Sequence, residues 1–155
     1  MTDHAALFAH PANRIAYALF RAHGLLLAVG DKVTAPFGLT SARWQVLGQI
    51  VASEGGLPAA QIARHLELTR QSVQRVLDDL ARLGMVDWAD NPNHRRAKLA
   101  VLTDAGHTAF AAATARWQPM ADAIVAGLGE TDADRLDALL DRLSHILDQP
   151  VIPEG

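Results

Sequence analysis

The spacing of apolar residues changes abruptly at Gly84. Before this glycine, apolar side chains recur every three or four positions, which is the period of one helix face, at Val73, Val76, Leu77, Leu80 and Leu83. After it, the segments 85–90 and 97–102 are short runs typical of strands, and the turn-rich loop between them begins at Asn91. Glycine suits the left-handed conformation that ends many helices. We therefore expect a helix over 69–83, followed directly by a β-hairpin over 85–103.

Helical patterns flank this unit on both sides. They cover residues 13 to about 36, 40–51, 58–65, a long segment from 103 onward, and 131–147. Pro58 suits the first turn of the short third helix, and Thr131 is the expected start of the last one. Two helices joined by the short turn at Glu67-Leu68 and followed by a hairpin form a winged helix–turn–helix. The predicted fold class is therefore mainly α, with a small β-hairpin wing.

The first and last helices carry longer apolar stripes than one winged domain can cover. Exposed in a monomer, the stripe that ends at Leu147 would be an unusually large apolar patch. Pairing two chains would bury both stripes. It would also place the two copies of the helix 69–83 roughly 34 Å apart, which is the spacing of successive major grooves of DNA. We expect 1–38 and 104–155 to form a helical dimerisation region, and 39–103 to form a DNA-binding domain. The alternative is a monomer that buries both stripes internally.

The net charge of −3 hides an asymmetry along the chain. Residues 58–103 carry seven Lys or Arg and five Asp or Glu, whereas residues 104–155 carry three and nine. A basic segment suits a phosphate-rich partner, but an excess this small is also common in proteins that bind no nucleic acid. The functional argument therefore depends on where the cations lie.

Polar side chains dominate the first two turns of the helix 69–83. Apart from two inward valines, these positions hold Thr69, Arg70, Gln71, Ser72, Gln74 and Arg75. A helix in the major groove brings its N-terminal residues to base edges and phosphates, where Arg matches guanine and Gln matches adenine. A polar helix face is ordinarily only solvated. Here, however, the hairpin adds Arg95, Arg96 and Lys98, which can reach flanking phosphates or the minor groove, so we expect sequence-specific binding to double-stranded DNA.

These residues resemble the MarR family of bacterial transcriptional regulators. The resemblance lies in Leu68–Leu80, Gly84, Asn91-Pro92, Arg95–Lys98 and Leu102-Thr103-x-x-Gly106, and it extends over roughly 13–147. It implies a homodimer held by the first, fifth and sixth helices, with a wing arginine at the minor groove and a ligand between the domains. By position, Arg75 matches the recognition-helix arginine and Arg96 the wing arginine. The expected function is a dimeric repressor of a palindromic operator, responsive to a small molecule.

Two parts of this resemblance leave alternatives open. His94 occupies the position of the aspartate in the family's Asp-x-Arg wing motif, so it is either a pH-dependent contact or a passive loop residue. The ligand candidates are large or polar side chains on helices that the resemblance places around the crevice, namely Tyr17, His23, Arg43, Trp44 and Trp117. An arginine beside aromatic rings suits an aromatic or phenolic effector. The alternative is that both tryptophans belong to the core.

Patterns typical of other function classes are absent from the sequence. It has no Gly-rich phosphate loop, no cysteine and no Ser-His-Asp arrangement in a credible context, so we expect neither an enzyme nor a cofactor. The spacing of His107 and His145 with nearby aspartates fits solvated helix faces better than a metal site. The N-terminus lacks a signal-peptide pattern and no apolar run is long enough to span a membrane, which predicts a cytoplasmic protein. The remaining alternative is a winged-helix module that binds proteins instead of DNA.

Overall fold

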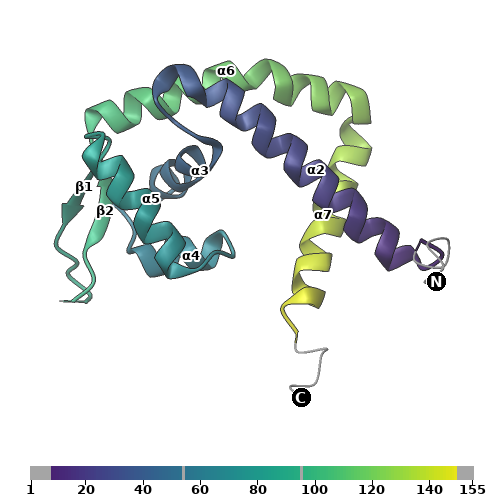
Figure 1. The fold of residues 1–155 in the computed structure, drawn as a ribbon, viewed down its shortest axis with the longest axis horizontal. Coiled ribbons are helices and arrows are strands. Elements are labelled where there is room, and N and C mark those ends of the chain that lie inside the picture. Colours follow the sequence, from purple (N-terminus) through teal and green to yellow (C-terminus); the bar gives the residue numbers. More distant parts are fainter. Residues whose placement is uncertain (1–7, 54, 95, 150–155) are drawn as a thin grey trace, which may run out of the picture. The chain divides into compact units, whose positions relative to one another are not determined.

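The computed structural model describes residues 8–53, 55–94 and 96–149 (Figure 1). In chain order, its elements are α2 (Pro11–Thr34), the short 3-10 helix η1 (Ala35–Phe37), α3 (Ser41–Val51), α4 (Ala59–His65), α5 (Arg70–Arg82), β1 (Val86–Ala89), β2 (Leu99–Leu102), α6 (Asp104–Leu128) and α7 (Glu130–Leu147). Helices α4 and α5 followed by the β1–β2 hairpin are a winged helix–turn–helix, so the predicted fold class is confirmed. The chain forms two compact units, Met1–Arg116 and Trp117–Gly155, and α6 runs from the first into the second.

Local side-chain caps set several of the helix starts. The Thr40 hydroxyl accepts a hydrogen bond from the Arg43 N–H at 3.3 Å and so caps α3. Two predicted starts are shifted by one residue. Pro58 precedes α4 instead of occupying its first turn, and α7 begins at Glu130, directly after Gly129, which has a φ of +82°. A glycine with positive φ is enough to interrupt the helix between α6 and α7, so Thr131 lies inside the last helix.

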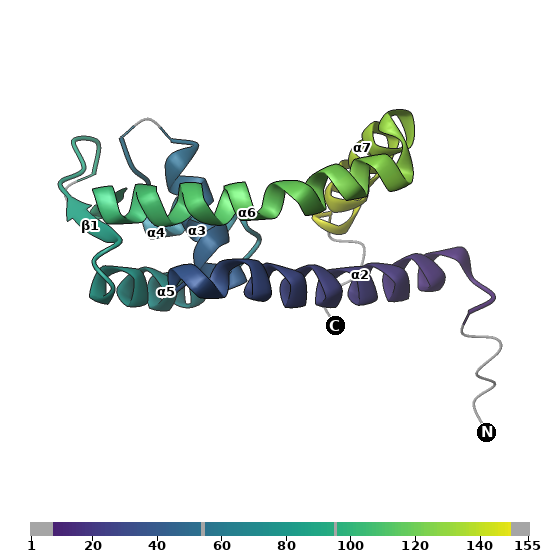
Figure 2. The same cartoon turned by 90° about the horizontal axis from the view of Figure 1, so that it is seen from above.

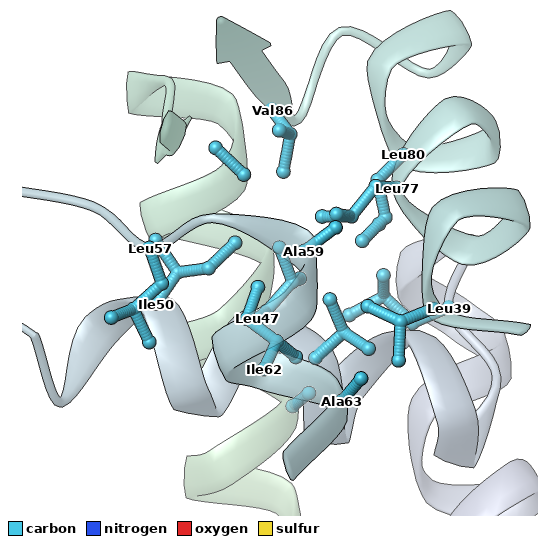
Figure 3. Packing of buried hydrophobic residues seen from close by; sticks show 14 residues of the cluster. Leu39, Leu47, Ile50, Leu57, Ala59, Ile62, Ala63, Leu77, Leu80 and Val86 are labelled. Carbon is cyan, nitrogen blue, oxygen red and sulfur yellow. The ribbon is translucent and has the colours of Figure 1, made fainter. Parts of the chain in front are cut away.

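The core of the first unit forms where α3, α4, α5 and the hairpin meet. Figure 3 shows Leu47, Ile62 and Leu77 pointing toward one another from these three helices, and all three are fully buried. Val86 and Ala100 cover this cluster from the two strands. One residue of the predicted apolar face, Leu83, is instead 47% exposed, because it lies at the end of α5 where the chain turns away.

The base of the wing is held by a third stretch of extended chain. The antiparallel pair of β1 and β2 runs from Val86↔Leu102 to Ala89↔Leu99. Leu57, just before α4, adds two hydrogen bonds to Ala100, with N···O distances of 3.1 and 2.9 Å. A Cβ on Gly56 would lie 2.6 Å from the Ala100 oxygen, so this close approach needs a glycine. The hairpin is therefore anchored to the segment that enters α4.

Thr103 ties the end of the hairpin to its beginning. Its hydroxyl donates to the Gly84 oxygen at 2.7 Å and accepts from the Gly106 N–H at 3.1 Å. Its backbone N–H donates to the Met85 oxygen at 3.1 Å. One residue thus caps α6 and closes the wing, which fixes the hairpin relative to the end of α5.

The second unit consists of the end of α6 and of α7. No described residue of α7 is buried, although the helix carries large apolar side chains. Those with well-exposed side chains on α7 are Leu136, Leu139, Leu140, Ile146 and Leu147. This unit therefore presents apolar surface that its own residues do not cover.

Candidate nucleic-acid interface

Helix α5 carries a strongly polar outward face. Its inward residues Val73, Leu77 and Leu80 are fully buried, which turns the intervening positions outward. Among the predicted DNA contacts on α5 and at its cap, Thr69, Arg70, Gln71, Ser72 and Arg75 are exposed and Gln74 is half-buried. The structure therefore leaves Arg75 free to reach a groove of DNA, one turn away from the helix N-terminus.

The cap of α5 is formed by Thr69, one of the two hydroxyl residues predicted to contact DNA. Thr69 Oγ1 accepts from the Ser72 N–H at 3.1 Å and donates its own proton to Ser72 Oγ at 2.9 Å. This contact holds the two hydroxyls together in the first turn of α5. Ser72 keeps its O–H, and the α5 N–H groups around it favour an anion. Thr69 thus caps α5, and Ser72 lies exposed in the first turn of this helix.

A groove separates α5 from the wing. It has a volume of about 390 Å³ and is lined by Pro58, Ala59, Ala60, Arg70, Gln74, Asp78, Trp88, Arg96, Ala97 and Lys98. Arg70 comes from the first turn of α5, whereas Arg96 and Lys98 come from the wing, so the fold brings cations from both predicted contact regions to one groove. Figure 2 shows the hairpin leaving the end of α5, which is the connection that places the wing there.

Backbone contacts shape the wing loop. The Asn91 side-chain oxygen accepts from the Asn93 N–H at 2.9 Å, which is an Asx turn. The His94 N–H donates to the Asn91 oxygen at 3.2 Å, and its own carbonyl accepts from the Ala97 N–H at 3.1 Å. The His94 side chain is exposed. The loop therefore turns without an acidic residue at position 94; the predicted contact Arg95 lies outside the described residues.

The five predicted ligand residues have diverse surroundings. Tyr17 packs on Phe8 and Phe20, with ring centroids 5.0 and 6.4 Å away, and His23 is exposed. The Trp44 indole N–H donates to the Thr114 hydroxyl at 3.3 Å.

Arg43 pairs with Asp79 on α5, and Trp117 belongs to the second unit. A second groove, of about 270 Å³, lies between the end of α3, β2 and His107. Neither this groove nor the one beside α5 is lined by these five residues. Their ligand role stays a prediction.

Sequence reasoning missed two residues that help to form the α5–wing groove. Asp78 lies one turn beyond Gln74 and two turns beyond Arg70, so the spacing of four residues already placed all three on one helix stripe. Trp88 lies two residues after the buried Val86, on the same face of β1, and its half-buried side chain gives the groove an aromatic wall. The strand pattern alone could not say which face of β1 turns toward α5.

Membrane-spanning helices and clusters of metal-binding side chains are both absent from the described part of the chain. None of the helices there combines the length and apolar character needed to cross a membrane. No group of three or more His, Cys, Asp or Glu there is arranged to hold a metal ion. His145 Nε2 lies 3.7 Å from Asp141 Oδ2, one turn away on α7, and this contact is exposed.

The fold and this polar helix with its basic hairpin define a winged-helix DNA-binding protein. Residues 37–97 match the model of the MarR family. Sco5413 of Streptomyces coelicolor, a MarR family transcriptional regulator, is 30% identical, with a TM-score of 0.76 over 88% of this chain and 95% of that one. The chain therefore belongs to the MarR family and is a transcriptional regulator of that type; the family consists of regulators and not of enzymes.

Two further solved structures share the fold. CouR of Rhodococcus jostii RHA1, bound to p-coumaroyl-CoA, is 25% identical, with a TM-score of 0.75 over 90% of this chain and 95% of that one. The S. aureus MepR–DNA complex is 22% identical, with a TM-score of 0.78 over 86% of this chain and 96% of MepR. At this identity, the likeness to MepR concerns the fold alone.

Proposed function

We propose that this regulator is a homodimeric repressor that binds a palindromic operator in the cytoplasm. The observation that carries the proposal is the groove in which Arg70 of α5 meets Arg96 and Lys98 of the wing. DNA-binding surfaces place cations where the two phosphate backbones pass, because phosphate contacts supply most of the affinity. A helix and a hairpin that share one cationic groove fit a duplex that contacts both.

In this proposal, α5 lies in the major groove and the wing at the minor groove. Arg75 and Gln71 are exposed on the outward side of α5, so both are among the side chains that reach base edges. Ser72 and Lys98 contact phosphates, and Arg96 enters the narrow groove or its phosphate rim. The domain 39–103 thus binds DNA, while 1–38 and 104–155 hold two copies together.

The proposed homodimer accounts for apolar side chains that each unit leaves uncovered. In the first unit, α2 exposes Ile15, Phe20, Leu25 and Leu26, each at 50% or more. In the second unit, α7 exposes the leucines named above. Large contiguous apolar surfaces are rare on monomers, so a second copy of the chain is the natural cover for both helices. The two-fold symmetry of such a dimer implies a palindromic operator.

An effector completes the proposal. CouR, with the same fold, is bound to p-coumaroyl-CoA, which contains a phenolic group. We infer that this regulator also responds to a small aromatic or phenolic molecule, and the residues to test first are Tyr17, His23, Arg43, Trp44 and Trp117. Titration of operator complexes with such compounds should release the DNA; full retention at saturating compound would argue against this part of the proposal.

Selection of duplexes from a random pool by the purified protein tests the central claim. We expect two inverted half-sites whose centres lie about one helical turn apart. Arg75→Ala should weaken binding to the selected site more than binding to unrelated DNA, because a base contact distinguishes the two. An equal loss on both would remove Arg75 from base recognition. Failure to bind any duplex at low salt would overturn the proposal and favour a protein-binding winged helix.

A further inference from the structure

Gln74 and Asp78 form a hydrogen bond within the α5–wing groove. The Gln74 Nε2 lies 2.9 Å from Asp78 Oδ1, one helical turn along α5, and both side chains line the groove. An ionised carboxylate only accepts hydrogen bonds, so the amide must turn its nitrogen, and not its oxygen, toward Asp78. The contact therefore fixes which end of the Gln74 amide faces the carboxylate.

This orientation leaves one acceptor and one donor of the Gln74 amide available to a DNA base. The Gln74 oxygen points away from Asp78 and accepts, and the second hydrogen on Nε2 remains available to donate. Adenine offers a complementary pair in the major groove, namely its N6 amino donor and its N7 acceptor. Guanine and thymine offer acceptors at O6, N7 or O4, and phosphates offer acceptors only, so none of these matches the Gln74 oxygen.

The surroundings of Asp78 make this contact informative. Arg70, Arg96 and Lys98 line the same groove, yet among the described residues the side-chain partner of Asp78 is the Gln74 amide. A carboxylate in a groove that faces phosphates lowers affinity for every DNA sequence. A role in orienting Gln74 explains why an acid is useful at that place.

We propose that Asp78 is a positioning residue that sets the base preference of α5. It holds the Gln74 amide so that Gln74 selects adenine at one position of each half-site. This inference rests on the proposed function, because it requires α5 to lie in the major groove of a specific operator. It concerns which base is chosen, and it leaves the phosphate contacts of the wing unchanged.

The test compares base preferences among five forms of the full chain: the unmodified protein, Asp78→Asn, Asp78→Glu, Gln74→Ala and the double variant Gln74→Ala with Asp78→Asn. The operator position that loses its preference in Gln74→Ala identifies the Gln74 contact. We expect adenine there, favoured over guanine by roughly tenfold in Kd. Asp78→Asn should reduce this preference severalfold, because an asparagine can donate as well as accept and lets the amide turn over. Asp78→Glu keeps an acceptor and should retain the preference.

The remaining comparisons separate the explanations. Removing the Asp78 charge should raise affinity for all sequences alike, so the ratio between operators, and not the affinity itself, is the measurement. In the Gln74→Ala background, Asp78→Asn should change no base preference. If Asp78→Asn changed the base preference as much in the Gln74→Ala background as in the unmodified protein, Asp78 would contact the base itself. That result would overturn the proposal.

An undiminished adenine preference in Asp78→Asn would also overturn the inference, as would an unaltered motif in Gln74→Ala. In both cases, the unmodified protein still selects an operator and the proposed function stands. If the unmodified protein selects no sequence, the proposed function and this inference fail together. Because both residues lie on the polar side of α5, thermal melting should show that all variants remain folded.

Discussion

Arg43 and Asp79 form an ion pair that joins α3 to the recognition helix, with 3.2 Å between Arg43 Nη2 and Asp79 Oδ2. The other carboxylate oxygen of Asp79 pairs with Arg82, one turn away on α5. Arg43 also donates from Nη1 to the Gly38 oxygen at 3.4 Å. Asp79 therefore links α5 to α3 at the edge of the buried cluster, and helps to fix the rotation that points Arg75 outward.

The first prediction concerns this ion pair. Arg43→Ala should lower the free energy of unfolding by less than about 1 kcal/mol, because both side chains are about one-third exposed and solvent screens the pair. Urea unfolding at a fixed protein concentration should show a smaller loss at high salt. Arg82→Ala is the matched control, since the Arg82 side chain is 76% exposed, and it should have almost no effect. An equal loss from both variants would contradict a linking role for Arg43.

A second prediction compares two glycines of α6. A Cβ on Gly106 would lie 2.0 Å from the Met85 oxygen, whereas nothing lies within 4 Å of a Cβ on Gly127. Gly106→Ala should therefore destabilise the protein by about 2 kcal/mol or more, because backbone must move. Gly127→Ala should be neutral or stabilise by up to about 1 kcal/mol, since alanine favours helix. Thermal melting measures both, and a harmless Gly106→Ala would contradict the close packing of α6 on Met85.

The third prediction tests the cap of α5. Thr69→Ala removes the acceptor for the Ser72 N–H and should lower the free energy of unfolding by about 1 kcal/mol. Thr69→Ser keeps a hydroxyl and should lie within a few tenths of a kcal/mol of the unmodified protein. Denaturant titration gives both values. If serine proved as costly as alanine, the Thr69 methyl group and not its hydroxyl would be the important part.

The fourth prediction addresses the wing. Removal of one phosphate contact should reduce the slope of log K against log salt by roughly 0.9, so Arg96→Ala should reduce it by about twice that in a symmetric dimer. Arg142→Ala on α7 removes the same charge from an exposed position far along the sequence, and should leave the slope unchanged. Fluorescence anisotropy across a salt series makes the measurement. An unaltered slope in Arg96→Ala would place Arg96 away from DNA.

The fifth prediction tests the homodimer. Leu139 and Leu147 are 48% and 73% exposed on α7, and charging both with Leu139→Glu and Leu147→Glu should separate the proposed dimer. Sedimentation should then show a monomer with weakened binding to the palindrome. Arg142→Glu adds an acid at an exposed polar position of the same helix and should preserve the dimer. A monomeric unmodified protein would disprove the dimer outright.

Much of the winged helix was predictable from the sequence because its signals are local. The Thr69 cap acts on an N–H three residues away, and Gly84, with a φ of +70°, ends the α5 region by its own backbone freedom. The periodic valines and leucines of α5 identify its buried face, so the outward position of Arg75 follows without knowledge of any other helix. Two helix starts, predicted at Pro58 and Thr131, differ from the structure by one residue.

Only the tertiary structure decided how these elements meet. The partner of Arg43 lies 36 residues away at Asp79, and the chain before α4 adds Leu57 to the hairpin through Ala100. Nothing in a local window specifies such pairs, because they depend on how the helices and strands pack around the shared core. By itself, therefore, the sequence determined the helix that ends at Gly84 and the hairpin that follows. The packing decided that Arg70, Asp78 and Arg96 share one groove.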